Sequence, residues 1–265
     1  MTLGRRQRPG WASAVLAALL LALGAGGGAS AEAFDAATTC AVPEEIATTE
    51  LPLPHVSARI KAHETVRILV IGSGSSAGMG TSSPADAYPE LLGKELAKIY
   101  PDAGFAVTND SKRGRSASDM EAHFAVEVGP LHPQLVIWQT GTVDAVKGLD
   151  LATFGEVLET GIDKLRSLGA DVILMNMQYS PHTTTALDTG PYRDYMRWAI
   201  MSRSAILFYR YSMMKYWVEQ GILDFSSTEK ADQMRNDDLA HACLAYRLAH
   251  VIESAVKAGE PETTR

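Results

Sequence analysis

The sequence predicts an α/β domain with a parallel sheet that is covered by helices on both faces. Short runs of aliphatic and β-branched residues alternate with longer segments whose apolar residues recur at helical spacing. This alternation implies right-handed β-α-β crossovers and therefore parallel strands. Because the 265 residues contain no internal repeat and no linker-like stretch, we expect one such domain with a substantial core.

The first residues have the composition of a secretory signal peptide. A segment with three arginines precedes the apolar run Trp11–Leu23, and Ala29-Ser30-Ala31 offers a small-residue cleavage site. An uncleaved anchor helix is the alternative, but the apolar run is short and ends in glycines. We therefore expect residues 1–31 to be removed, the mature protein to be periplasmic or secreted, and no stable membrane span to remain.

The expected mature chain is acidic. The whole sequence has a formal charge of −7, and removal of residues 1–31, with three arginines and no acidic residue, leaves −10. An acidic surface repels nucleic-acid phosphates and anionic lipids. The charge therefore argues against nucleic acid and anionic membranes as partners.

The rest of the chain divides into three parts. Residues 32–64 are expected to form a largely irregular N-terminal arm, residues 65–258 the domain, and residues 259–265 a polar tail. The expected strands are 66–71, 105–108, 134–139, 171–175 and 205–208. The expected helices are 85–100, one from 116, 151–168, 192–202, 212–220, and one from 237 or 238 to 257. Cap-forming residues at Ser116–Asp119 mark one helix start, and Gly169 marks a helix end.

The first strand ends in a run of small residues, Gly72 to Gly78, that we expect to open a helix. Ligands bind at the carboxyl ends of strands in open parallel sheets, so we expect the functional site here. Gly72-x-Gly74-x-x-Ala77 fits a dinucleotide fingerprint, but the first acidic residue of the second-strand loop, Asp110, lies beyond the required spacing. Gly74-x-Ser76-x-Gly78 fits a nucleophile elbow, but that motif sits in the middle of a sheet rather than after its first strand.

The two cysteines, Cys40 and Cys243, lie far apart in the sequence. In an oxidising compartment they are expected to form a disulfide that ties the arm to the last helix. The alternative is a small core residue at Cys243 and a free thiol at Cys40. Neither these cysteines nor the histidines have metal-ligand spacing, so we expect no metal.

Basic residues crowd the loop beside Gly114. They are Lys112, Arg113 and Arg115, and Asp110 lies among them. A solvated loop is the simpler interpretation, and a cationic pocket for an anionic ligand is the alternative.

Six segments carry an ordered series of family motifs. In chain order they are Ile71–Gly78, Ser82–Pro84 with Tyr88-Pro89, Asn109 with Gly114, Val136–Thr142, Leu207–Trp217, and Cys243–Ala245. Together they resemble the SGNH (GDSL-like) hydrolase superfamily, in particular an exported alphaproteobacterial branch whose first block reads Gly-Ser-Ser-Ser-Thr. The resemblance runs from about Cys40 to Val256. It implies a flavodoxin-like three-layer α/β/α fold with a five-stranded parallel sheet, and acyl-ester hydrolysis without a cofactor as the family reaction.

The resemblance implies a serine nucleophile, a histidine base held by an aspartate, and an oxyanion hole. The nucleophile position falls on Gly74, flanked by Ser73 and Ser75. The oxyanion donors fall on the N–H of Gly114 and on Val143, where the family has asparagine. Glycine supplies no nucleophile and valine no side-chain donor, so two of the groups that define the family are missing.

The aspartate and histidine have two possible registers. Read literally, the Asp-x-x-His motif is Asp238 with His241. Alignment on Cys243–Ala245 instead places the aspartate at Asp232 and the histidine at Arg235. We favour the second register because the family motif precedes the last helix.

We therefore expect a catalytically degenerate protein of the SGNH-hydrolase fold that binds a carbohydrate, an acyl-ester ligand or a protein. The alternative is an active serine esterase that uses Ser73 or Ser75 with Asp238 and His241. A dinucleotide-binding protein is a remote alternative.

Overall fold

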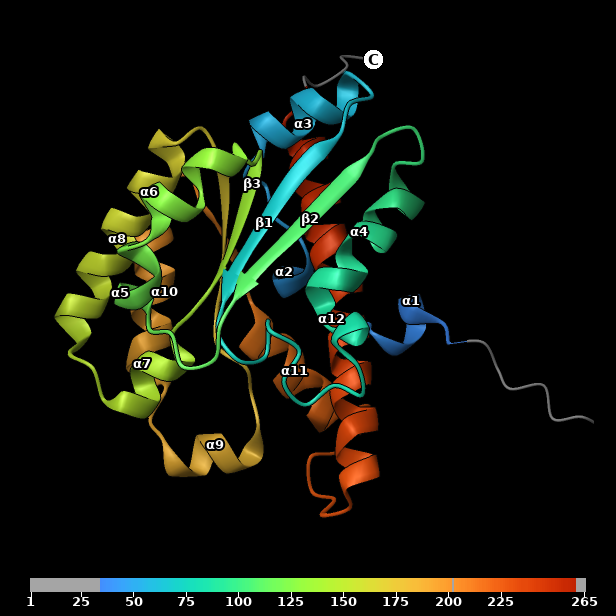
Figure 1. The fold of residues 1–265 in the computed structure, drawn as a ribbon. Coiled ribbons are helices and arrows are strands. Elements are labelled where there is room, and N and C mark those ends of the chain that lie inside the picture. Colours follow the sequence, from blue (N-terminus) through green and yellow to red (C-terminus); the bar gives the residue numbers. More distant parts are fainter. Residues whose placement is uncertain (1–33, 202, 261–265) are drawn as a thin grey trace, which may run out of the picture. The chain divides into compact units, whose positions relative to one another are not determined.

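A computed structural model describes residues 34–201 and 203–260 (Figure 1). Its centre is a parallel sheet with the strand order β2-β1-β3-β4-β5. The strands are β1 (Val66–Gly72), β2 (Phe105–Ser111), β3 (Leu135–Gln139), β4 (Asp171–Met175) and β5 (Ile206–Phe208). The five predicted strands are thereby confirmed.

Strand β2 is longer than predicted. Its last residues, Asn109 to Ser111, were expected in a polar loop, but they pair in register with Val70 to Gly72 of β1. Strand β2 lies at the edge of the sheet and alternates between partly buried and exposed residues before this polar end. Polar side chains at a sheet edge remain compatible with strand hydrogen bonding, so composition alone marks its end poorly.

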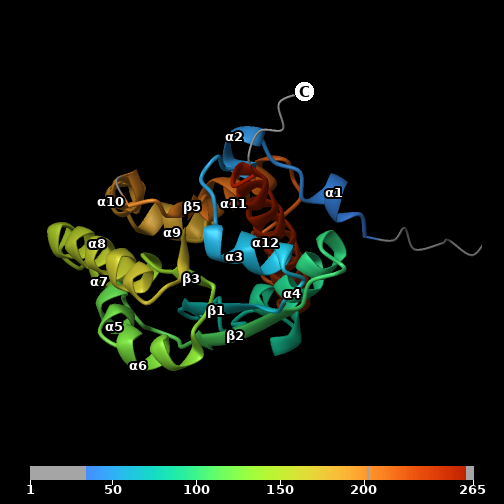
Figure 2. The same cartoon turned by 90° about the horizontal axis from the view of Figure 1, so that it is seen from above.

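Helices cover both faces of the sheet (Figure 2). Val66, Ile68 and Val70 of β1 belong to one core, with residues of the helices α4 (Tyr88–Ile99), α11 (Arg210–Glu219) and α12 (Lys230–Ala258). Leu69 and Ile71 belong to a second core, with residues of α5 (Ala117–Glu121), α8 (Leu151–Ser167) and α10 (Gly190–Met201). Alternate residues of one strand therefore point to opposite layers, which confirms the three-layer α/β/α fold.

The N-terminal arm is not irregular. Its described part contains three short helices, α1 (Ala36–Thr39), α2 (Glu44–Ala47) and α3 (Pro54–Lys61). Pro43 is the N-cap of α2 and Pro54 is the first residue of α3. Proline is well tolerated at these positions because its fixed φ suits the first helical turn and no N–H is needed there. Pro43 and Pro54 therefore mark helix starts in a segment that was expected to be largely irregular.

A disulfide joins the arm to the last helix. Cys40, directly after α1, is bonded to Cys243 of α12. The Arg247 Nε–H also donates to the Cys40 carbonyl oxygen at 2.5 Å. The predicted pairing is confirmed, and the alternative of a free Cys40 is wrong.

Helix α12 begins at Lys230, earlier than the predicted start at Asp237 or Asp238. The segment from Lys230 to Asn236 contains neither glycine nor proline, and Asp232 in the first turn interacts favourably with the helix dipole. The helix therefore extends over residues that were expected to precede it.

The segment after β1 does not open a helix directly. The Ala77 N–H donates to the Ser73 carbonyl oxygen at 3.1 Å, and the Met79 N–H donates to that of Gly74 at 3.0 Å, which closes successive turns. A 3₁₀ turn, η1 (Pro84–Asp86), follows, and α4 begins only at Tyr88. The dinucleotide fingerprint needs a helix that starts at its glycines, and this segment lacks one.

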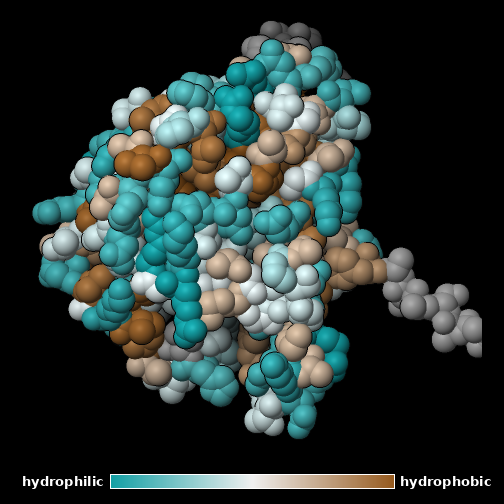
Figure 3. All heavy atoms as spheres, in the orientation of Figure 1, coloured by the Kyte–Doolittle hydropathy of each residue, from teal (hydrophilic) through white to brown (hydrophobic). Residues whose placement is uncertain are grey.

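Further short elements were not predicted. They are α6 (Phe124–Glu127), the 3₁₀ turn η2 (Gly129–Leu131), α7 (Thr142–Lys147) and α9 (Pro181–Ala186). The expected signal peptide and most of the polar tail lie outside the described residues. Among the helices that are described, none has the length and apolarity needed to cross a bilayer. On the face drawn in Figure 3, hydrophobic residues form separate groups among hydrophilic ones.

Candidate functional site

A pocket of about 520 Å³ lies at the carboxyl ends of the central strands. The turn after β1 contributes Ser73, Gly74 and Ser75, the loop after β2 contributes Gly114, and the first turn of α7 contributes Val143. These five positions were predicted from three separate segments of the sequence. The fold brings all of them to one pocket.

Gly74, the expected nucleophile position, has no free space above its Cα. A Cβ built on this residue would lie 2.7 Å from the Met79 sulfur, closer than real Cβ contacts. Met79 itself lines the pocket. The Met79 side chain, which is 45% exposed, would therefore have to move aside for a residue larger than glycine at position 74.

Ser73 lines the pocket and is held in place by Gln139 at the end of β3. The Ser73 N–H donates to Gln139 Oε1 at 3.0 Å, and the Ser73 hydroxyl donates to the same atom at 3.3 Å. Ser76 also donates to Gln139 Oε1, at 3.0 Å, and its hydroxyl lies 2.8 Å from that of Tyr88. Both serines are buried. They shape the turn, and Ser76 does not have the exposed position of an elbow nucleophile.

Ser75 contacts a buried arginine. The Arg210 Nη1–H donates to Ser75 Oγ at 2.8 Å. Arg210 is the first residue of α11 and is 2% exposed. Ser75, Arg210 and His241 line a smaller pocket of about 170 Å³ that shares Ser75 and Met79 with the larger one.

His241 is buried in α12 and has the wrong tautomer for a triad base. Its Nδ1 accepts the backbone N–H of Tyr88 at 2.9 Å. Because a backbone N–H only donates, Nδ1 carries no proton, and the proton of the neutral ring is on Nε2. A triad histidine instead carries its proton on Nδ1 and accepts the serine proton on Nε2. Burial, aided by the positive charge of Arg210, lowers the pKa of His241 to about 3.

Asp238 does not orient His241. Its carboxylate accepts the backbone N–H of Ser82 at 2.8 Å and the Ser82 hydroxyl at 2.5 Å. Between described residues, no hydrogen bond joins Asp238 to His241. In the alternative register, Asp232 and Arg235 pair with each other, and neither lines the two pockets. Both registers thus lie inside α12, and neither forms an aspartate-histidine pair.

The two positions expected to supply oxyanion donors, Gly114 and Val143, both line the pocket. Gly114 has a positive φ of +83°, which glycine adopts without strain. Val143 offers no side-chain donor. The neighbouring Thr142 also lines the pocket, but its Oγ1 is buried and has no hydrogen-bond partner among the described residues. Asp144 fixes this turn by accepting the N–H of Gly141 at 3.2 Å and that of Ala117 at 2.9 Å. Burial raises the pKa of Asp144.

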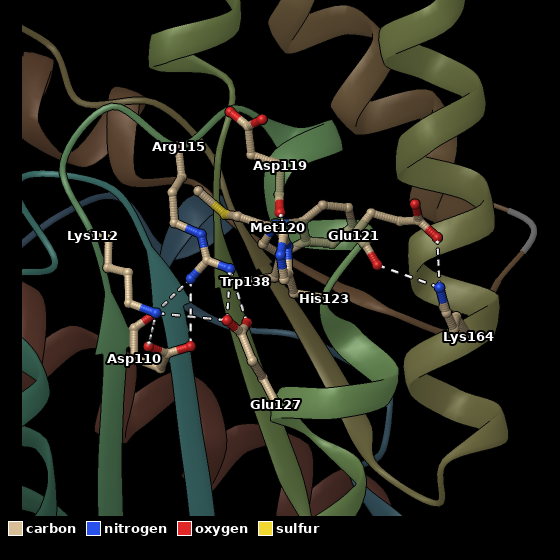
Figure 4. A network of polar contacts seen from close by, with 10 residues as sticks. All are labelled: Asp110, Lys112, Arg115, Asp119, Met120, Glu121, His123, Glu127, Trp138 and Lys164. Atoms are coloured by element: carbon tan, nitrogen blue, oxygen red, sulfur yellow. Dashed lines mark hydrogen bonds and ion pairs between the residues drawn. The ribbon is translucent and has the colours of Figure 1, made fainter.

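The basic loop beside Gly114 is largely neutralised (Figure 4). Arg115 pairs with Glu127 at 2.8 Å and with Asp110 at 3.4 Å, and Lys112 pairs with Asp110 at 3.0 Å. The Asp110 pKa is lowered because hydrogen bonds and the two cations outweigh its partial burial. Arg113 faces the larger pocket instead.

Sequence reasoning missed two residues of this site, Gln139 and Arg210. Gln139 is the last residue of the apolar strand β3, and Arg210 lies two residues after the apolar strand β5, at the start of α11; both are buried. A buried polar side chain at that edge needs a partner or a ligand, and this rule was the available signal. Among the described residues, no group of histidine, cysteine, aspartate and glutamate side chains is arranged to hold a metal ion.

Comparisons with known proteins agree with the fold. The solved structure of TesA matches with a TM-score of 0.52 and 21% identity over 67% of this chain and 97% of that chain. A two-domain esterase (CEX) active on acetylated mannans matches with a TM-score of 0.65 and 18% identity over 83% of this chain and 57% of that one. A catalytic mutant of Axe2, an acetylxylan esterase from Geobacillus stearothermophilus, matches with a TM-score of 0.57 and 16% identity. This match covers 71% of this chain and 94% of that one. At these identities the likeness shows the fold alone.

Sequence comparison points the same way. Esterase TesA of Pseudomonas aeruginosa is 29% identical over 115 residues, which are 43% of this chain. The match spans 56% of the length of that esterase. The model of the Non-GDSL lipase-like family matches residues 39–258. This match covers the whole sheet, both helix layers and the pocket, and the chain therefore belongs to the Non-GDSL lipase-like family.

Proposed function

We propose that this chain is an exported protein that binds an acylated carbohydrate or another acyl ligand in the pocket at the sheet edge and does not hydrolyse it. The observation that carries the proposal is the relation between Gly74 and Met79. The nucleophile position holds glycine, and the Met79 sulfur occupies the space above it. A triad enzyme that loses its nucleophile or base typically slows by ~10⁴–10⁶-fold.

The state of the base supports the same conclusion. His241 has its Nδ1 lone pair engaged by the Tyr88 N–H, and Asp238 is engaged by Ser82. A serine near the pocket therefore has no general base within this arrangement. Ser75 faces the guanidinium of Arg210, which only donates hydrogen bonds.

The pocket itself supports a binding role. Its volume of about 520 Å³ is in the range of small-molecule sites. The exposed Arg113 offers a polar group to a ligand, and Thr142, whose buried Oγ1 has no partner among the described residues, lines the same pocket. A buried hydroxyl without a partner has a free-energy cost that a ligand hydrogen bond removes.

Export is supported by two features. The first residues have the composition of a cleavable signal peptide. The Cys40–Cys243 disulfide is typical of proteins in oxidising compartments.

The choice of test ligand follows from the relatives. One structural neighbour is active on acetylated mannans and another is an acetylxylan esterase. For this chain we propose acetylated sugars as the first ligands. Xylose tetraacetate is the probe, and xylose, which has no acetyl groups, is its control.

Thermal unfolding and acetate release, measured on the same samples, test the proposal. We expect xylose tetraacetate to raise the melting temperature more than xylose does, with acetate release no faster than in buffer. Release that is lost in Ser75→Ala contradicts the proposal and supports an esterase in which Ser75 acts with His241, which lines the same small pocket. Absence of both stabilisation and release contradicts the proposed ligand class.

A further inference from the structure

We propose that the smaller pocket beside the site binds a carboxylate, with Arg210 as its receptor. This inference deepens the proposed function and rests on it, because it names a chemical group of the ligand that the larger pocket holds. Since the two pockets share Ser75, Met79 and Gln178, a ligand in the larger one can extend a group toward Arg210.

The guanidinium of Arg210 is buried and has only neutral partners. Nη1–H donates to Ser75 Oγ at 2.8 Å, and Nη2–H donates to Gln178 Oε1 at the long distance of 3.4 Å. Nε is buried and has no hydrogen-bond partner among the described residues. Within the same residues, no carboxylate lies at ion-pair distance from Arg210. The site thus holds a buried positive charge with an unused donor.

This arrangement is unfavourable without a ligand. A buried charge without an ionic partner loses its hydration and gains little in return. Arg210 is also the first residue of α11, where the helix dipole disfavours a positive charge. Burial lowers the pKa of Arg210 to about 10, so the side chain stays protonated at neutral pH. The attraction of a bound anion would offset the free-energy cost of removing this charge from water.

The surroundings favour a single carboxylate over a phosphate. Arg210 is one positive charge, and His241 beside it is neutral because burial lowers its pKa to about 3. Asp237 lines the same pocket, partly balances the charge of Arg210 from beyond ion-pair distance and opposes other anions, although burial and Asp238 raise its pKa. A phosphate dianion would face this carboxyl with one cation to balance it. A planar monoanion in a pocket of about 170 Å³ fits the forked guanidinium geometry better.

The chain offers matched variants. Arg210→Gln removes the receptor, and Asp237→Asn removes the opposing charge. Arg193→Gln is the control for loss of an arginine, because Arg193 stacks on Tyr211 and lines another pocket. None of these three changes touches Gly74, Ser73 or the Gln139 network.

Titration calorimetry with the full mature chain tests the inference. The probes are glucuronate, hexanoate and acetate, with glucose as the neutral control and inorganic phosphate as the competing anion. We expect a carboxylate to bind and glucose not to. We expect Arg210→Gln to weaken carboxylate binding at least about tenfold, Arg193→Gln to leave it unchanged, and Asp237→Asn to tighten it. If glucuronate binds more tightly than hexanoate, the natural ligand is an acidic sugar. If hexanoate binds more tightly, the natural ligand carries a fatty acyl carboxylate.

Several outcomes overturn the inference. They are equal carboxylate affinity in Arg210→Gln and wild type, tighter binding of phosphate than of any carboxylate, or no carboxylate binding at all. If Arg210→Gln fails to fold, unchanged affinity in Asp237→Asn overturns it. Stabilisation by xylose tetraacetate without carboxylate binding refutes this inference but leaves the proposed function intact, whereas serine-dependent acetate release refutes the proposed function.

Discussion

The backbone N–H of Tyr88 donates to Nδ1 of His241 across 2.9 Å, and this bond joins the first turn of α4 to α12. It fixes the imidazole in the tautomer opposite to that of a triad base. A histidine at this place therefore acts as a buried acceptor in the packing of two helices. This role has consequences for stability that can be measured.

Stability should fall in acid because of His241. In the unfolded chain the ring takes up a proton near its ordinary pKa of 6.5, whereas in the folded chain burial lowers this pKa to about 3. Between these values the unfolded state binds the extra proton. The free energy of unfolding should therefore decrease as the pH falls, by up to about 1.4 kcal/mol per pH unit.

Urea denaturation of wild type and His241→Gln between pH 7 and pH 4 measures this effect, since glutamine can still accept the Tyr88 N–H. The difference in the free energy of unfolding between wild type and His241→Gln should become smaller toward low pH, or change sign. His182→Gln, at an exposed position in α9, is the control and should follow wild type. If the free energy of unfolding depends on pH in the same way in wild type and His241→Gln, the buried imidazole does not contribute to acid sensitivity.

Restoring a serine at the nucleophile position should not restore activity. In Gly74→Ser the new Cβ meets the sulfur of Met79, a flexible side chain that is 45% exposed and can move aside, so stability should fall by no more than about 1 kcal/mol. Hydrolysis of p-nitrophenyl acetate should stay at the buffer rate because His241 is not a base in its observed tautomer.

The double variant Gly74→Ser with Met79→Ala separates the two causes. It should regain part of the stability lost in the single variant and remain inactive. If the double variant hydrolyses the ester, then Met79 prevents catalysis in Gly74→Ser, and the lack of a base does not.

Loss of the disulfide should destabilise the fold. Cys40 and Cys243 are separated by 203 positions, and a cross-link over so long a loop typically contributes about 2–4 kcal/mol. Dithiothreitol should lower the melting temperature of wild type and leave that of Cys40→Ser with Cys243→Ser unchanged. Equal melting temperatures of oxidised and reduced wild type would contradict a stabilising role.

Gln139 should be important for the turn that carries Gly74. Gln139→Leu leaves the buried N–H of Ser73 without its acceptor, at a cost of about 1–3 kcal/mol. Gln139→Glu keeps an acceptor oxygen and should be milder in urea denaturation. A leucine variant as stable as wild type would show that water or another group replaces Gln139 Oε1.

The sequence was informative about the fold and about which segments meet at the pocket. Apolar runs with strong periodicity located the five strands, and the motif series placed Gly74, Gly114 and Val143 at one edge. Helix starts were harder to predict, because Pro54 starts a helix inside a segment that was expected to be irregular, and α12 begins without a side-chain cap.

The roles of individual side chains depended on contacts over long sequence distances. The bonds from Tyr88 to His241 and from Ser82 to Asp238 cross more than 150 positions, and no local pattern specifies them. Arg210 likewise reaches Ser75 from the other half of the chain. Tertiary packing therefore determines the partners of His241, Asp238 and Arg210.

Fluorophosphonate labelling of the mature protein, read by intact mass and peptide mapping beside a p-nitrophenyl acetate assay, shows whether any serine of this pocket is a nucleophile. Wild type, Ser73→Ala and Ser75→Ala are compared. We expect no adduct and no turnover above buffer in any of the three proteins. A single adduct on Ser73 or Ser75, lost together with turnover in the matching alanine variant, would contradict this expectation and identify an active serine hydrolase.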